Sequence, residues 1–235
     1  MVSALGTIAL IGSALLVPGN LKQSKPATLS EQLKVLVQPR LVLVYLMTIL
    51  GYGGTFTAFT YLAPILQQEA GFAPSAISLI MLVYGASVAV GNIYGGKLAD
   101  KKGPIRALSI IFSALSLILF ALTFTMGNKV AAVFTVLVWG AFAFGNVPGL
   151  QVYVVQLAEK FTPNAVDVAS GLNIAAFNIG IALGSVVGGA IVEDMQLPDT
   201  AWIGALISVA ALLVTRYSGH LDNRAMNNAG KPASA

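Results

Sequence analysis

A dense group of charged side chains stands out in this 235-residue sequence, between two long apolar runs. Five of the twelve residues in segment 95–106 are charged, whereas charged residues make up 9% of the whole chain. The segment reads Gly-Gly-Lys-Leu-Ala-Asp-Lys-Lys-Gly-Pro-Ile-Arg, so one carboxylate, Asp100, lies among four cations. A link this short between two helices forces them to emerge side by side. We therefore expect a tight, ordered turn at this position.

Polar and aromatic side chains recur at helical spacing within two of the apolar runs. Intervals of three and four residues place such side chains on one face of a helix. One run carries Trp139, Phe142, Asn146, Gly149, Tyr153 and Gln156, and another carries Tyr45, Thr48, Tyr52, Thr55 and Phe59. Unpaired amides and charges are costly in hydrocarbon, so these faces are expected to line a cavity. Ordinary helix packing with hydrogen bonds is the alternative.

Seven of these polar residues, including two amides of a third run, are the candidate substrate-cavity residues: Tyr45, Tyr52, Asn146, Tyr153, Gln156, Asn173 and Asn178. None of the apolar runs holds an Asp, Glu, Lys, Arg or His deep within it. The uncharged set suits a neutral or weakly polar molecule. The third run also carries Gly180, Gly184 and Gly188 at four-residue spacing, which predicts close helix packing in lipid.

Several other kinds of chemistry have no support in the sequence. The chain has no cysteine, and it shows neither metal-ligand spacing nor a nucleophile–base pair nor a phosphate-binding glycine loop. We therefore expect no enzyme, no cofactor and no metal. The net charge of +4 needs no nucleic-acid partner, because the basic residues gather at the ends of the apolar runs.

The composition indicates an all-α integral membrane protein. Hydrophobic residues make up 57% of the chain and the mean hydropathy is +0.83, with 9% charged residues where soluble domains carry about 25%. A spanning helix needs about 20 apolar residues. This criterion predicts seven transmembrane helices, at residues 2–18, 41–66, 76–96, 107–126, 130–157, 168–192 and 200–217.

The distribution of basic residues predicts the orientation of these spans. Lysine and arginine gather on the cytoplasmic side of membranes. Twelve of the thirteen basic residues fall on one side of the predicted spans, and Lys129 alone falls on the other, which puts the N-terminus outside and the C-terminus in the cytoplasm. Two alternatives have weak support. A signal peptide at residues 2–17 lacks a preceding basic region, and a seven-helix retinal protein lacks the lysine it needs in residues 200–217.

The charged turn, Gly-x-Leu-Ala-Asp-(Lys/Arg)-x-Gly followed by a basic residue, resembles the signature loop of the major facilitator superfamily of secondary transporters. Residues 59–66 and 173–180 look like its drug and sugar efflux branch, which includes arabinose-efflux-like proton antiporters. The resemblance implies a conformational role for the loop residues Gly96, Asp100, Lys101, Gly103 and Arg106. Asp100 is expected to contact a helix N-terminus in the opposite bundle, unless it merely caps its own turn. Pro104 departs from the arginine usual after the second glycine.

Superfamily members usually have twelve spans in two six-helix bundles. The resemblance therefore implies that residues 1–18 are the sixth helix of the parent fold, the last of its first bundle. Residues 19–40 would be the central cytoplasmic loop, with a short amphipathic helix at 30–37. Residues 41–218 would be the complete second six-helix bundle, and residues 219–235 a cytoplasmic tail.

The functional expectation is efflux of a small sugar-like or drug-like solute by alternating access, in a bacterial inner membrane. The N-terminus would be periplasmic and the C-terminus cytoplasmic. Expected partners are membrane lipid, the small-molecule substrate, a proton in the full-length parent, and a missing N-terminal bundle or a homodimer partner. The alternative is a truncated, non-transporting fragment, or a half-transporter that acts only by pairing with a separate first bundle.

Overall fold

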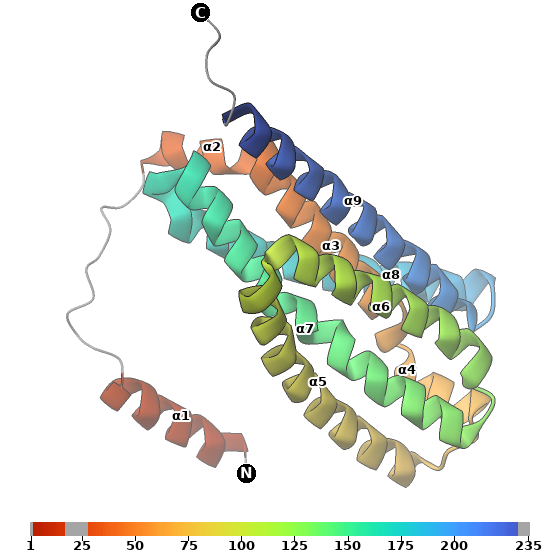
Figure 1. Ribbon diagram of the computed structural model, residues 1–235. Coiled ribbons are helices and arrows are strands. Elements are labelled where there is room, and N and C mark those ends of the chain that lie inside the picture. The colour runs from red at the N-terminus through yellow and green to blue at the C-terminus, as the bar shows by residue number, and fades with distance from the viewer. Residues whose placement is uncertain (1, 17–27, 230–235) are drawn as a thin grey trace, which may run out of the picture.

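The computed structural model describes residues 2–16 and 28–229, and all regular structure within them is helical (Figure 1). The first part of the link predicted over residues 19–40, residues 19–27 with Lys22 and Lys25, lies outside the described residues. The same holds for Met1 and for residues 230–235, the end of the predicted tail.

The helical elements follow one another as α1 (Val2–Leu16), α2 (Leu29–Val37), α3 (Pro39–Phe59), α4 (Leu62–Pro64), the π-helical turn η1 (Ile65–Glu69), α5 (Pro74–Lys102), α6 (Pro104–Thr125), α7 (Lys129–Phe161), the 3-10 turn η2 (Pro163–Ala165), α8 (Val166–Asp194) and α9 (Asp199–Ala229). Six stretches of the described residues are long and apolar enough to cross a membrane: Pro39–Glu69, Pro74–Lys102, Pro104–Thr125, Lys129–Phe161, Pro163–Asp194 and Asp199–Ala225.

These six stretches confirm six of the predicted spans, and the count of seven is approximate. The described part of α1 is helical but has 15 residues, fewer than the roughly 20 needed to span, and α1 stands apart from the six-helix bundle (Figure 1). The long helices continue beyond their apolar runs. Because α9 extends to Ala229, the segment predicted as a tail from residue 219 begins as helix.

The first half of the bundle consists of α3, α5 and α6, and the second half of α7, α8 and α9. The first helix of each half packs against helices of the other half. The central helix α3 packs mainly against α8 and α9 from the second half, and α7 packs mainly against α5 and α6 from the first half. The two outer helices α6 and α9 pack against each other. The span of α3 is the most buried of the six, whereas the spans of α5 and α8 are the least buried. Each of these two helices therefore has one side without a helix neighbour.

Proline, asparagine and glycine set the helix ends. Pro39, Pro74 and Pro104 occupy the first turns of α3, α5 and α6, where proline has no intrahelical hydrogen bond to lose. Asn128 caps α7 by accepting hydrogen bonds from the amides of the second and third helical residues, both at 3.1 Å. Gly103 is the single residue between α5 and α6, and its φ of 78° favours glycine. The predicted tight turn is therefore one residue long.

Close backbone contact joins each central helix to a less buried one. A Cβ at Gly180 would lie 2.7 Å from the Ile49 carbonyl oxygen of α3, and one at Gly188 would lie 2.5 Å from that of Thr57. The sequence did not single out the equivalent pair on α5. A Cβ at Gly91 or Gly95 would collide with the backbone of α7. Small residues at four-residue spacing thus join α3 to α8 and α5 to α7.

Candidate functional site

An aromatic cluster from three helices lies on one side of the bundle at membrane depth. The Tyr52 ring of α3 meets Phe144 of α7 edge-on at 5.6 Å between centroids, and Phe177 of α8 at 4.6 Å. Phe56, one turn beyond Tyr52, stacks on it at 6.0 Å. Tyr52 is buried, whereas the three phenylalanines are half-buried. Such geometry favours aromatic pairing and leaves the phenylalanine rings partly open on the outside of the cluster.

A hydrogen-bonded network centred on Asn173 joins the same three helices. The Thr48 hydroxyl donates to Asn173 Oδ1 at 2.7 Å, and Asn173 Nδ2 donates to Gln151 Oε1 at 3.1 Å. The amide of Gln151 in turn donates to Ser170 Oγ. Asn173 is fully buried, and its amide is satisfied on both sides. Gln151 and Ser170 are half-buried, so the network reaches the surface of the bundle.

The aromatic cluster and the Asn173 network occupy one continuous face. Thr48, Tyr52 and Phe56 follow at intervals of four residues along α3, and Ser170, Asn173 and Phe177 recur at helical spacing along α8. Phe144 and Gln151, seven residues apart, share a face of α7. We call these eight residues the three-helix face. Tyr45 adds its hydroxyl at the edge, 3.5 Å from the Ala169 carbonyl oxygen.

Pro148 adds a backbone acceptor on the same side of α7. Proline has no N–H, so Pro148 donates no helical hydrogen bond to the carbonyl of Phe144, four residues earlier. The helix nevertheless runs through this position without interruption, from Lys129 to Phe161. The Phe144 carbonyl therefore lacks its usual helical donor beside a half-buried aromatic ring.

The stripe predicted along α7 lies elsewhere. Trp139 and Asn146 are fully buried, and Trp139 packs against Phe59 and Tyr84 in the interior. Asn146 Nδ2 donates to the carbonyl of its own helix at Ala143. The structure thus brings Tyr45, Tyr52 and Asn173 together but separates them from Asn146. A cavity role for Asn146 stays a prediction.

The other predicted cavity residues lie outside the three-helix face as well. Asn178 is exposed and bonds to the carbonyl of Ile174 within its own helix, at 3.0 Å. Gln156 is exposed near the end of α7, at a basic cleft described below. Within the described part of the chain, no three His, Cys, Asp or Glu side chains are placed to hold a metal ion.

Tyr153 belongs to an ion-pair network that ties three helix ends together. Arg40 at the start of α3 pairs with Asp222 of α9 and donates to the Tyr153 hydroxyl at 3.2 Å. That hydroxyl donates to Asp222 Oδ2 at 2.8 Å and lies 2.7 Å from Ser218 Oγ. Tyr153 and Ser218 are buried. The network closes this end of the bundle, so Tyr153 does not contribute to the three-helix face.

The charged-turn residues lie on the α5–α6 corner at the same end of the bundle. Gly96 is half-buried and faces Pro148, whose ring a Cβ there would meet at 3.7 Å. Asp100, Lys101 and Arg106 are exposed, and none of them forms an ion pair within the described residues. Asp100 is therefore available for a contact from outside the bundle, and its role as a latch stays a prediction.

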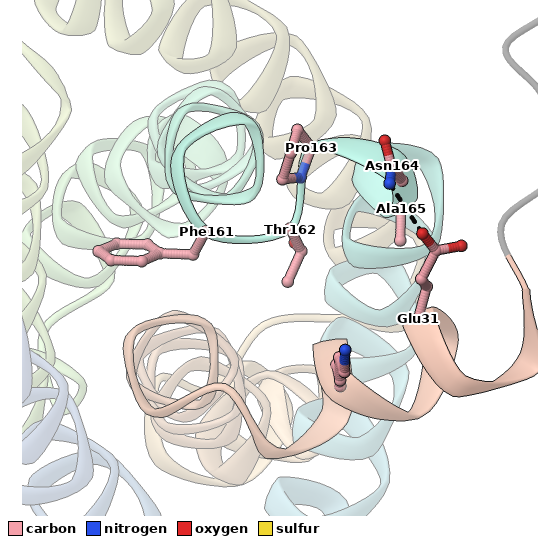
Figure 2. Close-up of a pocket in the computed structure, with 7 residues that line it drawn as sticks. Glu31, Phe161, Thr162, Pro163, Asn164 and Ala165 are labelled. Atoms are coloured by element: carbon pink, nitrogen blue, oxygen red, sulfur yellow. Dashed lines mark hydrogen bonds between the residues drawn. The ribbon is translucent and has the colours of Figure 1, made fainter.

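The short helix α2 is attached to the link between α7 and α8. Figure 2 shows Glu31 of α2 bonded to Asn164, whose amide donates at 2.7 Å, beside a pocket of about 160 Å³. Glu31 also accepts from the Thr28 backbone amide in a capping box. The Thr28 amide, then the Asn164 side chain, hold the pKa of Glu31 below its usual value. Val35 anchors α2 by burying its side chain completely.

Sequence reasoning missed Gln151, Ser170, Arg40 and Asp222. The sequence places Gln151 among apolar residues, but it falls between the members of the α7 stripe, so spacing alone gave no reason to choose it. Arg40 and Asp222 are 182 residues apart, one in the first turn of α3 and the other beyond the apolar part of α9, where charges are common. Only the packing of α3 against α9 makes them partners.

A six-helix bundle with aromatic and amide side chains at membrane depth defines a multi-pass integral membrane protein. Comparison with known proteins specifies it further. The model of the Major Facilitator Superfamily matches residues 1–164. The chain belongs to this superfamily, whose members are transporters and not enzymes.

The relatives are bacterial transport proteins. An uncharacterized MFS-type transporter, YtbD of Bacillus subtilis, is 49% identical over 224 residues, covering 95% of this chain and 56% of the relative. The inner membrane transport protein YdhP of Escherichia coli K12 is 32% identical, covering 92% and 54%. A probable sugar efflux transporter of Helicobacter pylori is 28% identical, covering 84% and 49%. The chain is thus a multi-pass membrane protein with bacterial relatives, and it spans about half the length of these relatives.

A solved structure supports the fold. The transporter FucP, in its outward conformation, superimposes with a TM-score of 0.70 at 14% identity, covering 92% of this chain and 52% of that one. The observed bundle is therefore a major facilitator fold over roughly half the length of a complete transporter.

Proposed function

We propose that this chain supplies the second bundle of a transporter that exports a small organic solute by alternating access. The observation that carries the proposal is the three-helix face, where three half-buried phenylalanine rings and the half-buried amide of Gln151 lie within membrane-spanning helices. Lipid-facing positions disfavour such amides. The sites of this transporter class lie at the interface between repeats near the bilayer midplane. We assign Tyr52, Phe144, Gln151, Asn173 and Phe177 to one wall of that site.

The partner in this proposal is a first six-helix bundle, with α1 as its last helix. The open sides of α5 and α8 carry exposed large apolar residues, such as Leu82 and Ile93 on α5 and Leu183 and Val186 on α8. Part of the three-helix face belongs to α8, so a bundle seated on α5 and α8 would cover this face. The relatives' additional length provides room for such a bundle. Asp100 would then latch onto a helix N-terminus of that partner.

The proposed substrate is neutral and sugar-like or drug-like. The three-helix face offers half-buried phenylalanine rings and the half-buried amide of Gln151, a combination that orients a largely apolar or hydroxylated molecule. The name of the Helicobacter pylori relative, a probable sugar efflux transporter, agrees with this class. We propose that proton entry drives export and that the coupling carboxylate belongs to the first bundle, because the face itself carries no ionisable acid. The N-terminus would be periplasmic and the C-terminus cytoplasmic.

An export assay tests the proposal in cells that lack their own pumps. Dye or sugar efflux is compared for this chain alone, for the chain co-expressed with the first half of YtbD, and for the empty vector. We expect efflux only with the partner, and its loss on adding a protonophore. Export by the chain alone would mean that a second copy of the chain takes the place of the first bundle. Absence of export in every arm would favour the non-transporting fragment.

Two amide variants test the face itself in the co-expressed form. Gln151→Leu should lower export by about 2- to 10-fold, the value of one neutral hydrogen bond. Asn178→Ala is the matched control, because that amide bonds only within its own helix. Equal export by both variants, at equal expression and melting temperature, would show that the three-helix face is not part of the substrate site.

A further inference from the structure

A second hollow lies at the end of the bundle, away from the three-helix face. Its volume is about 720 Å³, and it opens between the α5–α6 corner, the end of α7 and the late part of α9. Four cations from four helices line it: Lys102, Arg106, Lys160 and Arg216. The proposed transport cycle has no use for this basic cleft.

The cations of the basic cleft are not neutralised by the protein. Arg40–Asp222 is the one ion pair within residues 2–16 and 28–229. Asp222 is the single carboxylate lining the cleft, and that pair already engages it. Lys160 lies over the Phe161 ring at 5.4 Å, a contact that leaves its charge in place. Four like charges at one hollow repel one another unless an anion occupies it.

The start of α6 adds to the positive potential of the cleft. Gly103, the N-cap residue, has no side chain to accept from the first helical amides, and both Gly103 and Pro104 line the hollow. The N-terminal end of a helix dipole attracts anions. Close approach of α6 and α9 supports this corner, because a Cβ at Gly219 would lie 2.6 Å from the Ile105 side chain.

The surroundings identify the source of the anion. Arg106 and Ile110 lie four residues apart on one face of α6, and Ile110 is exposed. Arg216 and Leu213 lie three residues apart on α9, and Leu213 is exposed. In each helix the apolar residue is the deeper one within the span. A headgroup among the cations would therefore have exposed apolar side chains directly below it for its acyl chains.

We propose that the basic cleft binds the phosphate of an anionic phospholipid headgroup. Basic hollows between membrane helices are suited to such headgroups, at roughly 1 kcal/mol per basic residue. The shared chemistry is phosphate, and the exposed apolar residues beneath the cations favour a lipid over free phosphate. Occupation would hold α5, α6, α7 and α9 together at this end.

Native mass spectrometry of the full chain, released from detergent micelles, tests the assignment. The probes are dioleoylphosphatidylglycerol, zwitterionic dioleoylphosphatidylcholine and inorganic phosphate. We expect retained phosphatidylglycerol adducts and few phosphatidylcholine adducts. Arg106→Gln with Arg216→Gln should weaken phosphatidylglycerol binding about 30-fold, at about fivefold per basic residue. Lys102→Gln with Lys160→Gln provides a second pair in case the first does not fold.

Lys129→Gln is the matched control, because this cation lies at the opposite end of the bundle, at the start of α7. The same loss in Lys129→Gln and in the arginine pair would overturn the site. Equal retention of the two lipids would overturn it as well. If inorganic phosphate displaces phosphatidylglycerol at micromolar concentration, the ligand is soluble phosphate and the lipid assignment is wrong.

Discussion

Replacing Gly184 by alanine tests whether the packing of α3 against α8 depends on backbone contact. An added Cβ would collide with the carbonyl oxygen of Gly53 and would lie 3.0 Å from the Gly53 Cα and 3.1 Å from its carbonyl carbon. These three atoms are backbone, so no side chain can rotate away. The helices themselves must separate. Gly171 lies on the same helix, and a Cβ there would meet nothing within 4 Å.

The pair of variants isolates the cost of that collision. Overpacking costs about 1–3 kcal/mol, and the rigid neighbours put Gly184→Ala in the upper part of this range. Each variant also gains about 0.5–1 kcal/mol from replacing glycine in a helix. We therefore expect Gly184→Ala to lower the free energy of unfolding by about 1–2 kcal/mol. Gly171→Ala should be neutral or slightly stabilising, so the difference between the two variants is about 2–3 kcal/mol.

Unfolding by dodecyl sulfate in mixed micelles, followed by tryptophan fluorescence, measures this difference. Each variant is compared with the unchanged chain at the same mole fraction of detergent. If Gly184→Ala and Gly171→Ala unfold at the same midpoint, the helices are not in backbone contact at this position. The small-residue ladder of α8 would then be a feature of composition without a role in packing.

Three further predictions concern the helix ends. Tyr153→Phe should lower the free energy of unfolding by about 1–3 kcal/mol, because the ion pair at the bundle end loses a buried hydroxyl partner. Tyr217→Phe, at an exposed site, is the control and should change that free energy by less than about 0.5 kcal/mol. Unfolding in detergent measures both variants. Gly103→Ala should lower the free energy of unfolding by about 1–3 kcal/mol, because its φ of 78° and ψ of 155° form a conformation that is essentially limited to glycine. Gly127→Ala, where a Cβ meets nothing within 4 Å, should not lower it; the melting temperatures of the two variants test this. The pKa of Glu31 is lowered, so its bonds are at full strength above the unfolded pKa of about 4.3 and are lost as pH falls through the lower folded value. The protection of the α2 amides, which is their exchange rate relative to the intrinsic rate at the same pH, should therefore fall below about pH 4, and Glu31→Gln should abolish that dependence.

The long helices were predictable because hydropathy acts locally. Every one of the six long spans contains an apolar run that the sequence marks, since water and lipid select residues along the whole length of a helix. The helix ends were harder to place. The charged segment 95–106 was expected as a turn, but its first four charges lie in helix α5 and the fifth, Arg106, lies in the first turn of α6. A helix end is set by the residue that stops the hydrogen bonding, here a glycine at positive φ, and not by where apolar residues cease.

The direction in which a helix face points could not be predicted from one helix alone. The spacing of Trp139, Asn146 and Tyr153 correctly places them on one side of α7, yet this side packs into the bundle. Gln151 lies on the side that meets α3 and α8, and it has fewer polar neighbours in the sequence. Both faces satisfy the rule that polar groups avoid lipid. Only the positions of the neighbouring helices decide which of them is open.

The exchange of helices between the two halves explains why the open sides fall on α5 and α8. The central helix of each half packs against the other half's second and third helices, so α3 relates to α8 as α7 relates to α5. Glycine ladders at four-residue spacing serve both of these pairs. Inverted repeats of three helices within each half of this superfamily have this arrangement. The helices α5 and α8 are equivalent in this relation, and they are also the two least buried spans. Part of the three-helix face belongs to α8, so in the proposed transporter a partner bundle that covers the open sides of α5 and α8 would cover this face as well.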